Sequence, residues 1–134
     1  MPYTHEILPT RKLAVVTASS EINLADCIKE MHEVARTPNF KPWYDVLVDL
    51  RTVSYTPTLF ESYQLARTLR ELRRTYSGPM AIVVSNSPHL GISKTIGSFV
   101  ESSGMKLGTF TTVEEAQRWL AEQTTKALPT SSPL

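Results

Sequence analysis

Short polar side chains follow the apolar runs of this sequence, and they are its best candidates for chemistry. The apolar runs predict buried strands, and most of them lead into an amphipathic helical period. In a parallel sheet the carboxyl ends of the strands meet at one edge, where helix N-termini also point and ligands bind. We therefore expect a polar edge able to hold a small anion or a polar head group, made of Ser19, Ser20, Asp49, Thr56, Thr58, Ser85, Asn86 and Ser87.

The same residues also have a purely structural interpretation. Ser, Thr, Asn and Asp are the side chains that cap helix N-termini, and every expected helix needs a cap. Thr58, followed by Glu61, has the spacing of a capping box. Asp49 is more typical of a carboxylate that accepts loop N–H groups or pairs with Arg51 than of a catalytic base. Capping is therefore the simpler interpretation of the polar edge.

Metal and covalent chemistry find little support in the sequence. His5, His32 and His89 lack the spacing of a metal site and have no cysteine nearby. Cys27, the single cysteine, falls in the first expected helix and is interpreted as a partly buried structural thiol. Because no nucleophile–base or acid–base pair can be assembled, an enzyme ranks last among the functions considered. We expect neither a metal nor a cofactor.

Three arginines form a regular pattern in the second expected helix. Arg67, Arg70 and Arg74 are spaced by three and four residues and predict a basic stripe, which could contact an acidic partner or a phospholipid head group. A solvated face whose cations complement the helix C-terminus is the simpler interpretation. Fourteen basic and thirteen acidic residues leave a formal net charge of +1, so nucleic acid is not an expected partner.

The elements that must position these residues follow from the hydrophobic pattern. Strands are predicted at about residues 3–8, 11–17, 45–50, 80–84 and 105–110. Helices are predicted at about residues 21–36, 58–76, 88–103 and 112–123. The order β-β-α-β-α-β-α-β-α indicates an α/β domain with a mixed, mainly parallel five-stranded sheet. We expect one domain over residues 1–125 and a disordered tail at 126–134.

Targeting signals are not evident in the sequence. No run approaches 18 apolar residues, and the N-terminus has no apolar block preceded by positive charge. A single cysteine suits a reducing compartment. We therefore expect a cytoplasmic protein that is not an integral membrane protein.

The order of elements, the segment VLVDLRTVSYTPTLFE and the ending FTTVEEAQRWL resemble the SpoIIAA-like branch of the STAS superfamily, which is grouped with SEC14-like domains. The resemblance covers about residues 3–123. It implies a SpoIIAA-like fold and a non-enzymatic regulatory or protein-interaction domain. Anti-anti-sigma proteins of this superfamily carry a D-S-S-G-like sequence at the start of the helix after the central strand, where phosphorylation of a serine switches partner binding. That serine falls on Thr58, a candidate regulatory phosphorylation site, while Pro57, Leu59 and Phe60 replace the other three residues.

Three functions from different classes stay open. The first is the regulatory or protein-interaction domain, which implies a protein partner. The second is a binder of a lipid or other amphipathic small molecule, as the SEC14-like association suggests, and it predicts an apolar cavity under the second and third helices. The third is an enzyme of unknown type. A homodimer formed through the aromatic loop at residues 40–44, or through an edge strand, is a further hypothesis.

Overall fold

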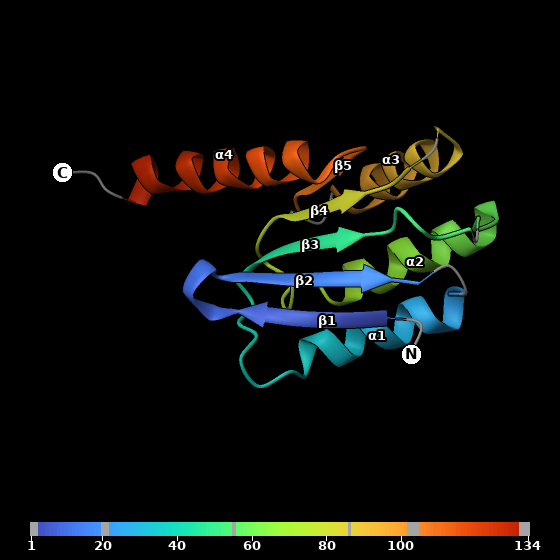
Figure 1. Ribbon diagram of the computed structural model, residues 1–134, viewed down its shortest axis with the longest axis horizontal. Coiled ribbons are helices and arrows are strands. Elements are labelled where there is room, and N and C mark those ends of the chain that lie inside the picture. The colour runs from blue at the N-terminus through green and yellow to red at the C-terminus, as the bar shows by residue number, and fades with distance from the viewer. Residues whose placement is uncertain (1–2, 20–21, 55, 86, 102–104, 132–134) are drawn as a thin grey trace.

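The computed structural model of the 134-residue chain describes residues 3–19, 22–54, 56–85, 87–101 and 105–131, without the side chains at 87–90, 99, 101 and 124–131. Strands and α-helices alternate after an initial hairpin, as the hydrophobic pattern predicts (Figure 1). The strands are β1 (Tyr3–Leu8), β2 (Leu13–Ala18), β3 (Asp45–Asp49), β4 (Met80–Val83) and β5 (Leu107–Phe110). The helices are α1 (Leu24–Ala35), α2 (Leu59–Glu71), α3 (Ser87–Glu101) and α4 (Val113–Ser131), with a short 3₁₀ helix, η1 (Pro9–Arg11), in the hairpin.

The strands form one five-stranded sheet in the order β1-β2-β3-β4-β5. β1 pairs antiparallel with β2, and the pairs from β2 to β5 are parallel. Each parallel connection passes through a helix and moves the chain one strand further in the same direction. Because such crossovers are right-handed, the three connecting helices lie on the same face of the sheet. The α/β class and the mixed, mainly parallel sheet predicted from the sequence are confirmed.

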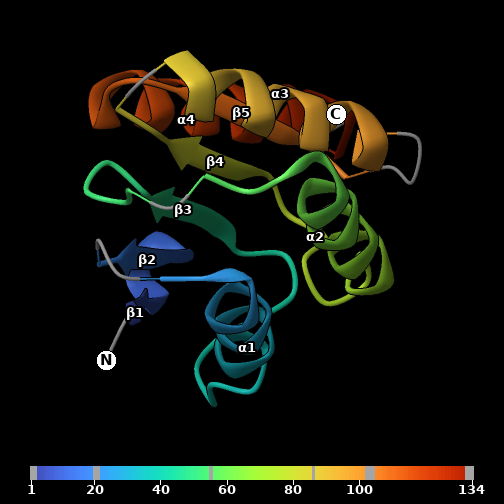
Figure 2. The same cartoon turned by 90° about the vertical axis from the view of Figure 1, so that its right-hand side faces the viewer.

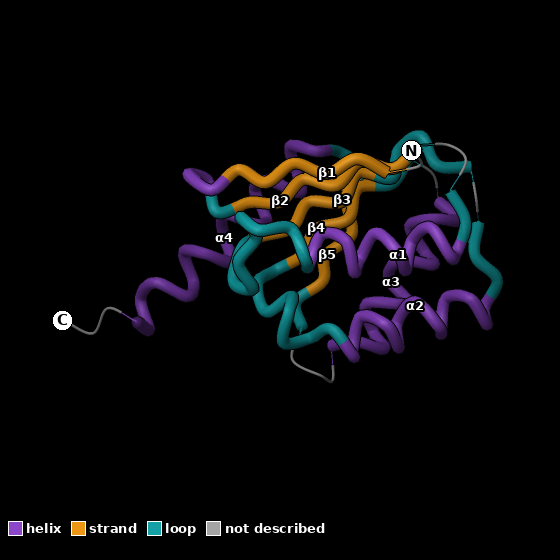
Figure 3. Tube along the Cα trace, turned by 90° about the horizontal axis from the view of Figure 1, so that it is seen from below, coloured by secondary structure: helices purple, strands orange, loops and turns teal. Residues whose placement is uncertain are grey.

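Helices α1, α2 and α3 cover one face of the sheet, and α4 covers the other (Figure 2). Seen from below, the first three helices lie together beneath the strands, while the end of α4 extends past the sheet (Figure 3). Side chains alternate along β3, so Val46 and Val48 pack with the first three helices and Leu47 packs with α4. Burial on both faces explains why β3 is apolar at successive positions.

Helix α1 begins at Leu24, later than the expected start near residue 21. Asn23 is its N-cap, and its side chain accepts a hydrogen bond of 2.9 Å from the N–H of Asp26. The Asp26 carboxylate in turn accepts one of 3.1 Å from the N–H of Asn23. This reciprocal pair fixes the start of the helix, because each side chain satisfies a backbone donor that the helix leaves unpaired.

Helix α2 ends at Glu71, earlier than the expected end near residue 76. The chain turns there, and the buried Tyr76 packs against Phe40 with ring centroids 5.5 Å apart. The Tyr76 hydroxyl donates a hydrogen bond to the carbonyl of Met31 in α1. A tertiary contact therefore overrides the helical pattern that extends to residue 76 in the sequence.

Helix α4 differs from its prediction in the opposite direction. It passes the expected end at residue 123 and continues to Ser131, through most of the segment 126–134 that was expected to be disordered. No Gly or Pro interrupts this helix before Pro129, and adding residues to an existing helix requires no new nucleus. Residues 132–134 lie outside the described residues. Neither α4 nor another helix in the described part of the chain is long and apolar enough to cross a membrane.

Candidate functional site

An apolar cavity of about 140 Å³ lies between the sheet and helices α1, α2 and α3. The sheet contributes mainly valines and isoleucine to its wall, and the helices contribute Leu65, Leu69 and Ile96 among others. None of the lining residues found in the described part of the chain belongs to α4. Protein interiors contain few voids larger than a water molecule, so a space of this size is a candidate ligand site.

Short β-branched side chains form part of the cavity wall on the side of the sheet. Val16, Val46 and Val84 are buried in the wall, and β-branched side chains of this length reach only a short way toward the helices. The valines suit a strand covered on both faces. The short reach of these valines contributes to the cavity between the sheet and the helices.

The cavity extends from the amino to the carboxyl ends of the parallel strands. Tyr76 and Met80, both buried, line the end near the amino termini of the parallel strands. Leu50, Pro57 and Ile92, which are only partly buried, lie at the carboxyl end, where the chain leaves β3, enters α2 and begins α3. The cavity therefore approaches the surface at the edge where ligands bind in α/β sheets.

A tyrosine and the cysteine contribute polar atoms to the wall. The Tyr3 hydroxyl donates a hydrogen bond of 3.0 Å to the Cys27 sulfur. Burial raises the pKa of the Tyr3 phenol and of the Cys27 thiol. Both groups therefore remain neutral near pH 7. Cys27 is partly buried, as expected for a structural thiol.

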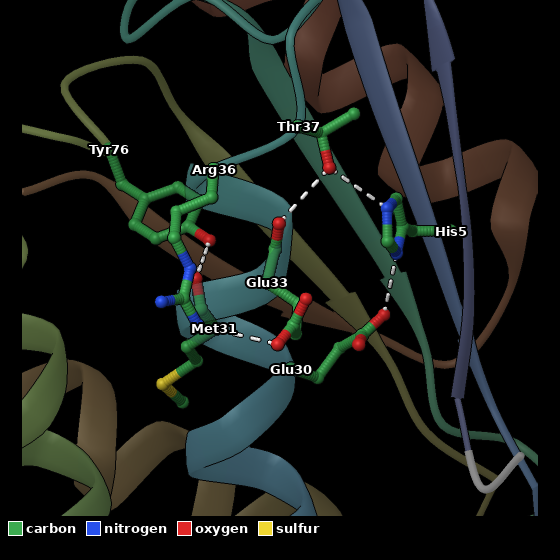
Figure 4. A network of polar contacts seen from close by, with 7 residues as sticks. All are labelled: His5, Glu30, Met31, Glu33, Arg36, Thr37 and Tyr76. Carbon is green, nitrogen blue, oxygen red and sulfur yellow. Dashed lines mark hydrogen bonds and ion pairs between the residues drawn. The ribbon is translucent and has the colours of Figure 1, made fainter.

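Glu30 is a further lining residue, and a polar network from β1 and the end of α1 holds its carboxylate (Figure 4). His5 Nδ1 lies 2.9 Å from the Glu30 carboxylate, and His5 Nε2 lies 2.9 Å from the Thr37 hydroxyl. Thr37 donates to the carbonyl of Glu33 at 3.0 Å. The contact between His5 and Glu30 could not be predicted from the sequence, because 25 residues separate the two side chains and no local spacing pattern links them.

Ser93 of α3 is a polar residue in the wall that sequence reasoning also missed. Its side chain is 7% exposed and lines the cavity. Within the described part of the chain its hydroxyl makes no hydrogen bond, unlike those of Thr95 and Ser98 in the same helix. The signal was present in the sequence, since Ser93 lies three residues before Ile96 and seven before Val100, on the inward face.

Two residues of the expected polar edge have structural partners. The Asp49 carboxylate accepts hydrogen bonds from Arg51 Nε at 2.9 Å and Arg51 Nη2 at 2.8 Å. These bonds lower the pKa of Asp49. The Thr58 hydroxyl accepts from the N–H of Glu61 at 3.1 Å, and the Glu61 carboxylate accepts from the N–H of Thr58 at 2.9 Å. The pairing predicted for Asp49 and the capping box predicted at Thr58 are confirmed.

Three of the other polar-edge residues, Ser19, Thr56 and Ser85, lie within the described part of the chain. Ser19, Thr56 and Ser85 are exposed, and Ser19 does not cap α1 because Asn23 does. No hydrogen bond joins Ser19 to Ser85 among the described residues. Ser20, Asn86 and the side chain of Ser87 lie outside the described residues.

The outward face of α2 carries both apolar and basic side chains. Leu59, Phe60 and Tyr63 are 76%, 71% and 57% exposed, and we call them the α2 apolar patch. Arg67 and Arg70 follow it on the same helix, and Arg67 Nε lies 3.9 Å from the Glu71 carboxylate. Arg74 lies beyond the helix end at Glu71, so the predicted basic stripe contains two helical arginines rather than three.

The aromatic loop at residues 40–44 is divided between core and surface. Phe40 and Tyr44 are buried and meet edge to face with centroids 6.0 Å apart. Trp43 is 60% exposed. The loop therefore closes the core through two rings and leaves the third at the surface near the amino ends of the parallel strands.

Histidine and acidic side chains do not converge on a metal site in the described residues. His5 is engaged by Glu30 and Thr37, and His32 is exposed. The side chain of His89 lies outside the described residues. Among the described residues, the cavity and the outward face of α2 are therefore the candidate functional features.

A scan of protein-family models finds none that matches this chain, and a search of curated proteins finds no match either. The similarity to SpoIIAA-like domains therefore depends on the order of elements and on the two segments quoted above. The cavity and the outward face of α2 are the features of the structure that bear on function.

Proposed function

We propose that this protein binds a small apolar or amphipathic molecule in the cavity between the sheet and helices α1, α2 and α3. The observation that supports this function is the cavity itself, about 140 Å³ in volume with an almost entirely apolar wall. An engineered cavity of about 150 Å³ with a similar wall stays dry and binds benzene. Binding of a suitable ligand would restore the dispersion contacts that an empty apolar space lacks.

The position of the cavity supports the same proposal. Its carboxyl end reaches the partly buried Leu50, Pro57 and Ile92, so a ligand has a short path from the surface. The buried Tyr76 lies at its other end, with its hydroxyl already bonded to Met31. A ligand would therefore enter from the carboxyl edge of the sheet and place its apolar part toward Tyr76.

Binding can be tested with benzene as the probe. ¹⁵N-labelled protein titrated with benzene should show saturable chemical-shift changes at residues lining the cavity. Native mass spectrometry of protein purified without denaturation would show whether a ligand co-purifies. Ile92→Trp places a large ring at the partly buried carboxyl end and should weaken benzene binding at least about tenfold.

The matched control is Thr95→Trp on the same helix, because Thr95 is exposed and does not line the cavity. It should bind benzene as the wild type does. Circular dichroism of both variants would establish that they are folded. Equal benzene affinity in wild type and Ile92→Trp, or no saturable binding in the wild type, would refute the proposal.

The α2 apolar patch favours a second function, a regulatory protein-interaction domain of the STAS type. Exposed large apolar side chains that adjoin one another commonly mark a protein interface. The patch directly follows Thr58, the residue that the SpoIIAA-like resemblance aligns with a phosphorylated serine. A phosphate on Thr58 would lie at the N-terminus of α2 and beside the patch, where added charge would weaken an apolar contact.

This second function has its own test. A partner captured by the wild type and identified by mass spectrometry should be lost from the Leu59→Ser/Phe60→Ser variant, which keeps the buried face of α2. Thr58→Asp should also weaken capture, while Arg70→Ser, on the same helix beyond the patch, serves as the control. Phosphoproteomics of the protein from its native source would test Thr58 directly. Undiminished capture by the patch variant would exclude this interface.

A further inference from the structure

The polar groups of the residues that line the cavity differ in whether they have a hydrogen-bond partner within the described part of the protein. Tyr3 donates to Cys27, Tyr76 donates to the carbonyl of Met31, and the Glu30 carboxylate is held by His5. The hydroxyl of Ser93 has no hydrogen-bond partner in the described part of the chain, although its side chain is only 7% exposed. A buried hydroxyl without a partner is unfavourable, because it has given up its hydrogen bonds to water. A ligand that bonds to Ser93 would provide such a partner.

The charges of the wall restrict what the ligand carries. No Lys, Arg or His occurs among the lining residues found in the described part of the chain. The carboxylate of Glu30 is already paired with His5 at 2.9 Å. A carboxylate or phosphate inside this space would lose its hydration without gaining a cation, which is strongly unfavourable. The wall therefore favours an uncharged molecule.

The volume restricts the size of the ligand. About 140 Å³ is close to the roughly 150 Å³ of the engineered cavity that holds benzene. A single ring or a short branched chain fits such a space, whereas a full-length phospholipid requires much more room. Ser93 lies in the first half of α3, next to Ile92 at the carboxyl end of the cavity. The polar group of the ligand would therefore face the edge of the sheet, and its apolar part would lie deeper.

We infer that the ligand is a compact, uncharged ring or short-chain molecule with one hydroxyl or carbonyl group, and that this group hydrogen-bonds the Ser93 hydroxyl. The inference rests on the proposed binding function of the cavity and narrows it. A fatty acid or phospholipid wholly enclosed in this space is disfavoured, because its charged group would lose hydration without meeting a cation among the described lining residues. Ser93 is thereby assigned as the residue that selects for the polar group.

The test compares benzene, phenol, benzyl alcohol and benzoate as probes of the wild type and of Ser93→Ala. At pH 7.5 benzyl alcohol is neutral and benzoate, of similar size, is an anion. In the wild type phenol should bind at least as tightly as benzene, and benzoate at least about tenfold more weakly than benzyl alcohol. Ser93→Ala should weaken phenol binding about three- to tenfold and change benzene binding less than about twofold.

The matched control is Ser98→Ala, because Ser98 is exposed on the same helix and its hydroxyl donates to the carbonyl of Lys94 at 3.2 Å. It should keep the wild-type ratio of phenol to benzene affinity. An unchanged ratio in Ser93→Ala, with benzene still bound, would overturn the role of Ser93 and leave the cavity function intact. Benzoate binding as tightly as benzyl alcohol would overturn the uncharged class. No binding of any probe by the wild type would overturn both the inference and the function on which it rests.

Discussion

Asp45 begins β3 with a half-buried carboxyl group, and desolvation raises its pKa from 3.8 to about 6. The folded protein therefore binds this proton more tightly than the unfolded chain does. The stability gained from the neutral acid is fully present below about pH 4 and is lost as the pH rises through about 6. At neutral pH the Asp45 charge opposes folding.

Asp45→Asn should therefore stabilise the protein at neutral pH. A shift of this size corresponds to about 3 kcal/mol in full, and solvent screening of a partly exposed group reduces it to about 1 kcal/mol. Urea unfolding at pH 7.5 should show this increase in the free energy of unfolding. Below about pH 4 the two proteins should be equally stable. A stabilisation that is the same at both pH values would contradict the assigned cause.

The two carboxylates of β3 show what a sequence reveals about single residues. Asp49 and Arg51 are two positions apart, so their pairing could be predicted, and the structure confirms it. Asp45 begins the same strand, but its burial depends on the tertiary fold, and local spacing carries no signal of that. Ser93 was recognisable as a polar residue on an apolar helix face, whereas the absence of a partner for its hydroxyl was not.

The turn before β4 has a strict steric requirement at Gly78. A Cβ atom on Gly78 would lie 2.4 Å from the Tyr44 carbonyl oxygen and 2.6 Å from that of Trp43. These are backbone atoms, which cannot rotate away. The N–H groups of Ser77 and Gly78 also bond to the carbonyl of Pro42, so the two loops are held together.

Gly78→Ala should therefore destabilise the protein by about 3 kcal/mol or more, because the loop at Trp43 and Tyr44 has to move. Gly91→Ala is the matched control, since a Cβ there meets nothing within 4 Å and the residue lies within α3. That change should stabilise the protein by about 0.5–1 kcal/mol. Thermal denaturation followed by circular dichroism measures both. Equal effects of the two substitutions would show that the close approach is not what constrains Gly78.

The capping box at the start of α2 gives a second prediction for an element. Thr58→Ala removes the acceptor for the Glu61 N–H and should cost about 1 kcal/mol in urea unfolding. Thr58→Asp retains a capping oxygen and a favourable charge at the helix N-terminus, so its stability should remain close to that of the wild type. A loss in Thr58→Asp equal to that in Thr58→Ala would show that capping does not determine the effect. The comparison also separates stability from any effect of charge on partner binding.

Element boundaries were predictable where local chemistry decides them. The capping box of Thr58 and Glu61 correctly predicted the start of α2. The apolar run in β3 correctly predicted the central strand of the sheet. Helix α1 starts later than the helical period predicts, because Asn23 and Asp26 cap its N-terminus reciprocally. The end of α2 could not be found in this way, because it depends on the contact of Tyr76 with α1.

The whole molecule consists of two hydrophobic cores that share one sheet. The core with α1, α2 and α3 contains the cavity, and the core with α4 is smaller and contains Leu47 and Leu120. The alternation of inward and outward residues along β3 makes both cores depend on the same backbone. The sequence predicted the alternation of strands and helices and the mainly parallel sheet of this arrangement. The binding alternative anticipated an apolar cavity, but its volume and the partners of its polar groups depend on side-chain packing that a pattern does not specify.

Because the cores share a sheet, we expect the domain to unfold in one cooperative transition. Leu120→Ala, on the face away from the cavity, should lower the free energy of unfolding by about 2–5 kcal/mol. In a Trp43→Phe background, Trp119 is the remaining tryptophan and packs on Phe110 with centroids 5.5 Å apart, so its fluorescence reports the α4 face.

Circular dichroism reports all of the helices, most of which cover the cavity face. The fluorescence and circular dichroism midpoints should coincide in urea, both with leucine and with alanine at position 120. Benzene should raise both midpoints together if it binds only the folded domain. A fluorescence transition that precedes the other would mean that α4 leaves the sheet while the cavity core persists, and that the two faces are energetically separate.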